Sequence, residues 1–171
     1  MTIRWPEPHS TTAVIANAAL LAAAFRAAGA AVVLVHVATS PDGGGRLHSP
    51  VDEPQVRAQM PPDFAEIVPE LGPGDNDIVV TKRQWGAFYG TDLDLQLERR
   101  GIVTVVLGGI ATNYGVESTA RDAYERGYHL VLVEDAMSAR STADHAFACE
   151  RIFPRLGRLS HTAEVLAALT A

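Results

Sequence analysis

The 171-residue chain has a single cysteine, Cys149, so no internal disulfide can form. Disulfides are rare in reducing compartments and dense in small secreted domains. The N-terminus does not resemble a signal peptide, and no apolar run approaches the roughly 20 residues of a membrane helix. The nearest candidate, the alanine-rich stretch 13–31, contains Asn17 and Arg26. We therefore expect a cytoplasmic protein that does not associate with membranes.

Basic clusters are also lacking, and the formal net charge is −6. Nucleic acids and anionic membranes attract basic surfaces, so neither is an expected partner. Hydrophobic residues make up 47% of the chain and charged residues 20%, the balance of an ordinary globular protein. A chain of this length buries one sizeable core, and we predict a single domain over residues 1–171.

Two kinds of cofactor signal are missing. There is no G-x-G-x-x-G followed by an acidic residue at the dinucleotide spacing, and the six histidines form no His-x-His or His-x-x-x-His pair. The sequence therefore predicts no cofactor and no metal site.

What the sequence does contain is an alternation of buried strands and amphipathic helices. The apolar runs are unbroken rather than alternating, which is typical of strands buried on both faces of a parallel sheet. Strands are expected at 31–37, 77–80, 102–107 and 129–133; helices at 12–28, 63–70, 92–100, 113–126, 143–153 and 162–169, with a long polar loop over 39–62. The pattern predicts an α/β fold with a doubly wound, mostly parallel sheet flanked by helices in a Rossmann-type three-layer arrangement.

In such sheets ligands bind beyond the carboxyl ends of the strands. Lys82 follows one expected strand and can hold an anion there. The turn 108–115 follows another, and its small residues let backbone N–H groups at the start of a helix approach an anion. Trp85 and Phe88 either line a pocket beside Lys82 or fill the core.

Residues 109–123 read Gly-Ile-Ala-Thr-Asn-Tyr-Gly-Val-Glu-Ser-Thr-Ala-Arg-Asp-Ala. This stretch resembles the pattern G-[VI]-A-T-N-x-C-V-E-x-T-A-R-D-A of the isochorismatase-like (cysteine hydrolase) superfamily. The segment from Lys82 to the Gly-Thr at 90–91 and the Asp-Ala at 135–136 are similar too, and the resemblance covers roughly residues 14–169.

The resemblance implies a hydrolase with an Asp–Lys–Cys triad in which the cysteine attacks a carbonyl carbon. It also implies a cis peptide bond between Ile110 and Ala111, and an oxyanion hole formed by the N–H groups of Ala111 and Gly115. Lys82 takes the place of the triad lysine.

Two residues depart from the pattern. Gly115 occupies the cysteine position, which excludes thiol chemistry there; the resemblance implies that true isochorismatases share this glycine and hydrolyse a vinyl ether without a covalent intermediate. The triad aspartate belongs on a first strand before the first helix, yet residues 1–10 contain no aspartate. Three explanations stay open: an upstream segment is absent from this sequence, residues 2–5 form a shortened substitute strand, or a partner chain supplies the pairing.

Two hypotheses follow. In the first, the protein is an isochorismatase-like hydrolase of a small carbonyl, amide or vinyl-ether substrate that uses no cysteine nucleophile. Lys82, Ala111 and Gly115 are its catalytic residues, and the substrate-binding residues are Trp85, Phe88, Ile110, Thr112, Asn113 and Tyr114. In the second, it is a catalytically inactive protein that keeps the fold to bind a small molecule or to assemble. In both we expect a homo-oligomer, either a dimer or a tetramer.

Three further residues are interpreted as structural. His36 and Asp135 lie at the carboxyl ends of expected strands, and Cys149 lies on an expected helix far from the 109–123 segment.

Overall fold

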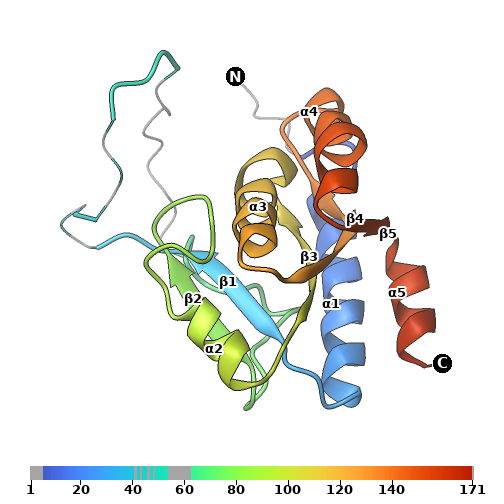
Figure 1. The fold of residues 1–171 in the computed structure, drawn as a ribbon. Coiled ribbons are helices and arrows are strands. Elements are labelled where there is room, and N and C mark those ends of the chain that lie inside the picture. Colours follow the sequence, from blue (N-terminus) through green and yellow to red (C-terminus); the bar gives the residue numbers. More distant parts are fainter. Residues whose placement is uncertain are drawn as a thin grey trace.

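The computed structural model describes residues 6–40, 42, 44–45, 47, 49–53 and 63–170 (Figure 1). Its α-helices are α1 (Thr11–Ala27), α2 (Leu93–Arg99), α3 (Glu117–Glu125), α4 (Thr142–Phe147) and α5 (Thr162–Leu169). Its strands are β1 (Val33–Val37), β2 (Ile78–Lys82), β3 (Thr104–Ile110), β4 (His129–Ser138) and β5 (Arg158–Ser160). Two π-helical turns, η1 (Thr112–Val116) and η2 (Ala148–Ile152), and a 3₁₀ turn, η3 (Phe153–Arg155), complete the list.

The strands pair in parallel, as expected, but they form two sheets rather than one. β1 pairs with β2, and β3, β4 and β5 pair in that order. Figure 1 shows β1 on the side of its sheet that is turned toward β3. Within the described residues, β1 and β3 therefore each keep one edge without a paired strand.

Side-chain exposure reflects this open edge. Val35 of β1 is paired with the fully buried Val80, yet it is 39% exposed. Every residue of β3 is at least partly exposed, whereas a central strand of a doubly wound sheet is covered on both faces. The strand expected at 102–107 is therefore present, but the expectation that it is buried is wrong.

β4 is the centre of a three-layer arrangement. Leu130 and Leu132 point to the α3 side and pack with Ala120 and Ala123 in the main core. The alternating residue Val133 points to the other face, where it packs with side chains of α1 and α5, Leu21 and Val165. The period of two along a strand thus places one core on each face of the sheet.

Local sequence signals fix several helix ends. The Ser10 hydroxyl accepts a hydrogen bond from the Ala13 N–H and caps the start of α1. Gly101 and Gly127, which follow α2 and α3, have positive φ angles of 63° and 87°. Glycine adopts this left-handed conformation without strain, so these helices end where the sequence indicates.

Other expectations need correction. The helix expected over 63–70 is absent, because this segment forms turns. The helix expected over 143–153 is divided into α4, η2 and η3, and the three-residue strand β5 has no strong sequence pattern. The substitute strand considered for residues 2–5 lies outside the described residues. No helix of the described part is both long and apolar enough to cross a membrane.

Candidate functional site

Lys82 and Gly115 meet at the carboxyl edge of the strands. Lys82 is the last residue of β2, and Gly115 lies in η1, just after β3. A Cβ atom placed on Gly115 would lie 3.1 Å from Lys82 Nζ. The fold therefore brings together two residues that are 33 positions apart, and a substrate atom beside Gly115 would contact the ammonium group directly.

The ammonium group of Lys82 is poorly solvated. It donates a hydrogen bond to the Trp85 carbonyl oxygen. Burial lowers the pKa of Lys82, because removing the cation from water disfavours the charged form. No ion pair found among the described residues includes Lys82. The site thus holds a partly buried ammonium group without a carboxylate within ion-pair distance in this part of the chain.

The turn beside Lys82 has an unusual backbone. The Ile110–Ala111 peptide bond is cis. It is followed at once by the π-helical turn η1, a form that occurs mainly as single turns and often at functional sites. Gly108 permits the approach to this turn, since a Cβ there would lie 3.0 Å from the Ala136 carbonyl oxygen on β4.

The side chains of η1 differ in their surroundings. Thr112, expected from the sequence to bind substrate, is fully buried, and its hydroxyl lies 2.9 Å from His145 Nδ1. The Asn113 Oδ1 atom is buried and has no hydrogen-bond partner among the described residues. Such an atom is costly unless a ligand or water satisfies it. Ile110, just before the turn, is 44% exposed.

Two aromatic rings stand over this edge. Trp85 and Tyr114 contact each other edge to face, with ring centroids 4.9 Å apart. Trp85 is 53% exposed, and the Arg140 guanidinium carbon lies 5.9 Å from the Tyr114 centroid. An exposed aromatic pair with a nearby cation can hold a planar or anionic small molecule.

Phe88 does not belong to this group. It is only 4% exposed, stacks on Tyr128 at 5.8 Å between centroids, and carries the Arg126 guanidinium over its ring. Of the two roles considered from the sequence, the structure places Phe88 in the core.

His36 and Asp135 also have structural partners. His36 is hydrogen-bonded to the Ala65 carbonyl oxygen and, at 2.7 Å, to the Thr81 hydroxyl. Asp135 Oδ1 accepts hydrogen bonds of 2.8 Å from both the N–H and the hydroxyl of Thr162, so it anchors the start of α5. These contacts agree with the structural roles expected for both residues.

Cys149 is nearer to the site than its sequence position indicates. Its Sγ lies 3.5 Å from His145 Nε2, and His145 Nδ1 lies 2.9 Å from Thr112 Oγ1 in η1. The expectation that Cys149 is far from the 109–123 segment is therefore wrong. The four-residue spacing of His145 and Cys149 predicts that they share a helix face, but only the tertiary structure places that face against Thr112.

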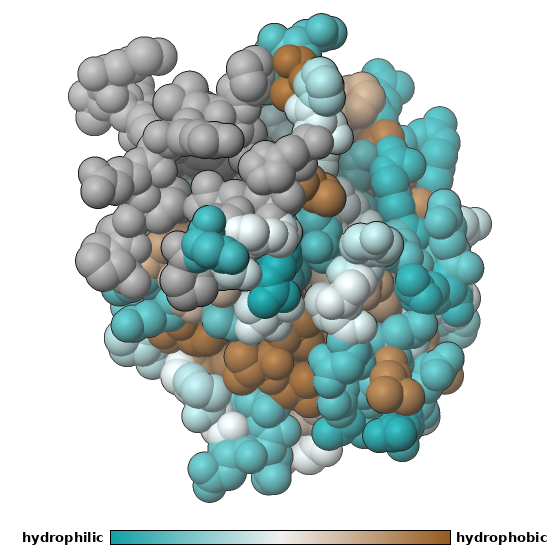
Figure 2. Space-filling model, turned by 90° about the vertical axis from the view of Figure 1, so that its left-hand side faces the viewer, coloured by the Kyte–Doolittle hydropathy of each residue, from teal (hydrophilic) through white to brown (hydrophobic). Residues whose placement is uncertain are grey.

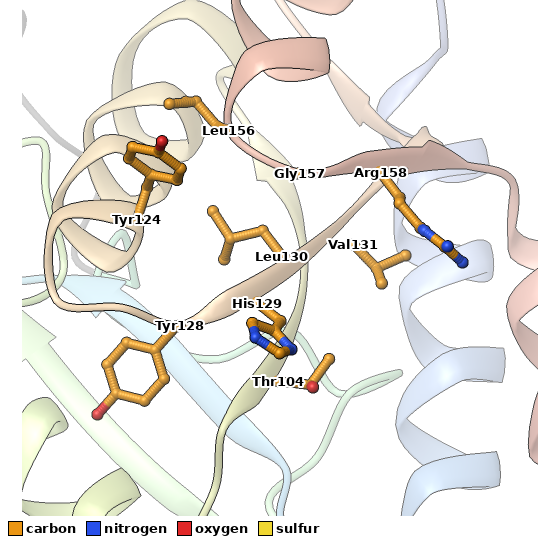
Figure 3. A pocket seen from close by; sticks show the side chains of 9 residues that line it. All are labelled: Thr104, Tyr124, Tyr128, His129, Leu130, Val131, Leu156, Gly157 and Arg158. Carbon is orange, nitrogen blue, oxygen red and sulfur yellow. The ribbon is translucent and has the colours of Figure 1, made fainter.

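A separate cavity lies at the opposite edge of the second sheet (Figure 3). Its volume is about 480 Å³, and it is bounded by the amino ends of β3 and β4, with Thr104, His129 and Tyr128 among its lining residues. None of the predicted site residues lines it. Lys82 and η1 thus form a distinct site.

Known proteins resemble the whole chain. The isochorismatase domain model matches residues 4–164. The isochorismatase family protein YecD of Escherichia coli O157:H7 is 50% identical over 162 residues, which cover 95% of this chain and 86% of YecD. The ureidoacrylate amidohydrolase RutB of Methylorubrum extorquens AM1 is 38% identical over 144 residues, 74% of this chain and 58% of RutB. The structure of an isochorismatase family protein from Burkholderia thailandensis superposes with a TM-score of 0.94 at 48% identity, covering 100% of this chain and 90% of that one.

Proposed function

This chain belongs to the isochorismatase family, and we propose that it hydrolyses a small carbonyl, amide or vinyl-ether substrate without a cysteine nucleophile. The observation that carries the proposal is the contact between Gly115 and Lys82. Position 115 carries a glycine in place of the cysteine thiol. The Nζ atom of Lys82 lies 3.1 Å from where a Cβ atom of residue 115 would be. The reactive atom of the substrate can therefore approach Lys82 itself.

Each group has a role in this scheme. Lys82 polarises or binds the substrate oxygen as a cation. The N–H groups of Ala111 and Gly115 stabilise the negative charge that develops on that oxygen. Trp85 and Tyr114 hold the flat part of the substrate from outside, while Ile110 and Asn113 line its near side. With no nucleophilic side chain at position 115, water attacks the substrate directly and no acyl-enzyme forms.

The acid that this reaction needs would come from the open edge between β1 and β3. The two edges adjoin the strand ends that carry Lys82 and η1. A parallel strand there would place its carboxyl end beside Lys82, and the chain before α1 already reaches this level, since Glu7 pairs with Ala139 just after β4. An upstream segment bearing an aspartate fits this position, as the family resemblance implies.

The relationship to RutB favours an amide substrate within this class. We would assay hydrolysis of ureidoacrylate, simple amides and a vinyl ether by the purified chain. We would also assay the chain lengthened at its N-terminus by the residues encoded in frame upstream. Turnover that Lys82→Ala lowers about 100-fold or more would support the proposal. Arg121→Ala, which removes an exposed cation paired with Glu117 on α3, is the matched control and should leave the rate unchanged.

One observation favours the second candidate, a catalytically inactive binding or assembly protein. No ion pair among the described residues includes Lys82, so no carboxylate of this part of the chain lies within ion-pair distance of it to act as an acid or base. Calorimetric binding of ureidoacrylate without turnover, in both the given and the lengthened chain, would support this candidate. A stop codon directly upstream in the reading frame would point the same way. Turnover that survives Lys82→Ala would contradict the site itself.

A further inference from the structure

Three potential metal ligands from three elements converge behind η1. They are Glu134 of β4, His145 of α4 and Cys149 of η2, and their ligand atoms all lie within 4.8 Å of one another. His145 Nε2 is the common point. It lies 3.5 Å from Cys149 Sγ and 3.9 Å from Glu134 Oε1.

These separations are close to those around a tetrahedral zinc ion. Zinc binds sulfur at about 2.3 Å, imidazole nitrogen at about 2.0–2.1 Å and carboxylate oxygen at about 2.0–2.2 Å. Tetrahedral angles then place such ligand atoms roughly 3.3–3.6 Å apart. The Cys149–His145 distance of 3.5 Å falls in this range, and the His145–Glu134 distance of 3.9 Å is only slightly longer, with Glu134 on a partly exposed side chain.

The histidine is held in the orientation that a metal requires. Nδ1 of His145 lies 2.9 Å from the hydroxyl of the fully buried Thr112. When Nδ1 carries the proton and donates a hydrogen bond to Thr112 Oγ1, Nε2 presents its lone pair toward Cys149 and Glu134. Ligating histidines commonly have such a partner behind the ring.

The position of the cluster allows an ion to enter. His145 and Cys149 are buried, but the Glu134 side chain is 32% exposed. His161 stands outside it, with Nε2 4.0 Å from Glu134 Oε2. One side of the three ligands is thus open to solvent, so a fourth ligand can be water or His161.

We propose that Glu134, His145 and Cys149 form a zinc site that braces β4, α4 and η2 against the turn η1. Mixed sulfur, nitrogen and oxygen ligands suit Zn²⁺ rather than Mg²⁺ or Ca²⁺, which prefer oxygen. On binding, the ion displaces the thiol proton of Cys149, which is released to solvent, and a zinc–thiolate bond forms. Through Thr112 the site is one hydrogen bond from the candidate oxyanion turn, yet it does not depend on the proposed hydrolysis.

The test uses the chelator-treated, dialysed protein and Co²⁺ as a spectroscopic probe, with Zn²⁺ added in competition. We expect one Co²⁺ per chain, intense visible bands of tetrahedral coordination, a near-ultraviolet thiolate-to-cobalt band, and displacement of all of them by Zn²⁺. Cys149→Ser should abolish the thiolate band, and Glu134→Gln should weaken cobalt affinity about 10-fold or more. His129→Gln, which changes an exposed histidine at the start of β4, should match the unmodified protein.

The proposal is overturned if the unmodified protein shows no thiolate band, or if the band persists in Cys149→Ser. Circular dichroism reports whether the serine variant folds. If it does not, Glu134→Gln decides, because its partly exposed side chain can be changed without opening a cavity; an affinity equal to that of the unmodified protein would then refute the site. None of these readouts depends on hydrolytic activity, so the two proposals fail separately.

Discussion

At the scale of single residues, the site depends on a lysine in an unusual setting. Lys82 is the only lysine in the chain, and it lies at a strand end against a glycine turn. Without a carboxylate among its described neighbours, desolvation is the dominant influence on it. Lys82 is therefore the main candidate for a reactive group, and its pKa reports whether a carboxylate stands beside it.

We predict that Lys82 titrates below an ordinary lysine, whose pKa is about 10.4. Burial disfavours the ammonium form in the folded state, so its pKa falls. Reductive methylation with ¹³C-formaldehyde labels this lysine and the α-amino group alone, and NMR can follow each resonance with pH. The urea-unfolded protein is the control and should give the ordinary value. A folded pKa at or above that value would show that a carboxylate faces Lys82.

Cys149 provides the second prediction at this scale. Burial raises the pKa of its thiol to about 12, and the reactive species is the thiolate. Any hydrolase activity should therefore survive iodoacetamide under native conditions, while the unfolded protein is alkylated at Cys149. Mass spectrometry locates the label. Inactivation that follows native labelling of Cys149 without unfolding would contradict a site that uses no cysteine.

At the scale of elements, an ion pair joins α1 to the turn before β2. Arg26 Nη2 lies 2.6 Å from Asp77 Oδ2, and the same nitrogen donates to the Leu71 carbonyl oxygen at 2.8 Å. Asp77 also accepts from the Gly74 N–H. The Arg26 guanidinium holds the pKa of this buried carboxyl group below its usual range. The pair fixes the amino end of β2 and hence the register that carries Lys82 to its position.

Replacing Asp77 with asparagine should lower the free energy of unfolding at pH 7 by about 1–3 kcal/mol, because a charged hydrogen-bond acceptor is lost. The folded pKa of Asp77 is depressed, so its stabilisation is present above the unfolded pKa, about 3.9, and is lost as the pH falls through the lower folded pKa. Urea denaturation from pH 7 to pH 2 measures this difference. Asp75→Asn, an exposed aspartate in the same turn, is the control. A deficit of Asp77→Asn that stays constant to pH 2 would contradict the ion pair.

The open edge between β1 and β3 also belongs to this scale. Unpaired strand edges invite pairing with another strand, and natural proteins usually cover them. In the described residues, β1 and β3 each run parallel to the strand that they pair with, and their unpaired edges border the candidate site. Within the described residues, the exposure of Val35 and β3 goes together with these unpaired edges.

At the scale of the whole molecule, apolar surface stays uncovered. Figure 2 shows an apolar area on the face that bears the β1–β2 sheet, and Leu20 of α1 and Val79 of β2 are both about half exposed. Contiguous apolar surface on a soluble domain commonly marks an interface. These surfaces support the proposal of a homo-oligomer.

We therefore predict a dimer or tetramer in solution. Burying such apolar surface between copies supplies the free energy of association, at roughly 25 cal/mol per Å². Light scattering coupled to size-exclusion chromatography gives the mass directly. Leu20→Asp should shift the mass toward the monomer if α1 takes part, and Asp75→Asn should not. A monomer mass for the unmodified chain over a wide concentration range would refute the prediction.

Local sequence determined much of this molecule. The capping residue Ser10 and the glycines after α2 and α3 set helix ends because capping and positive φ are properties of a few residues. The unbroken apolar runs predicted parallel pairing, and the residues 109–123 carried the family. Lys82 was identified because it lies just past the apolar run expected as a strand at 77–80, and it is the last residue of β2.

Tertiary structure alone decided the rest. Whether Phe88 lines a pocket or fills the core depends on what packs against it, and Arg126 and Tyr128 lie 38 and 40 positions further along the chain. The division of the described strands into two sheets depends on which strands lie side by side, and local patterns do not set that order. The meeting of Glu134, His145 and Cys149 depends on how α4 and η2 pack on β4, because side chains from separate elements share a site only when packing brings their faces together.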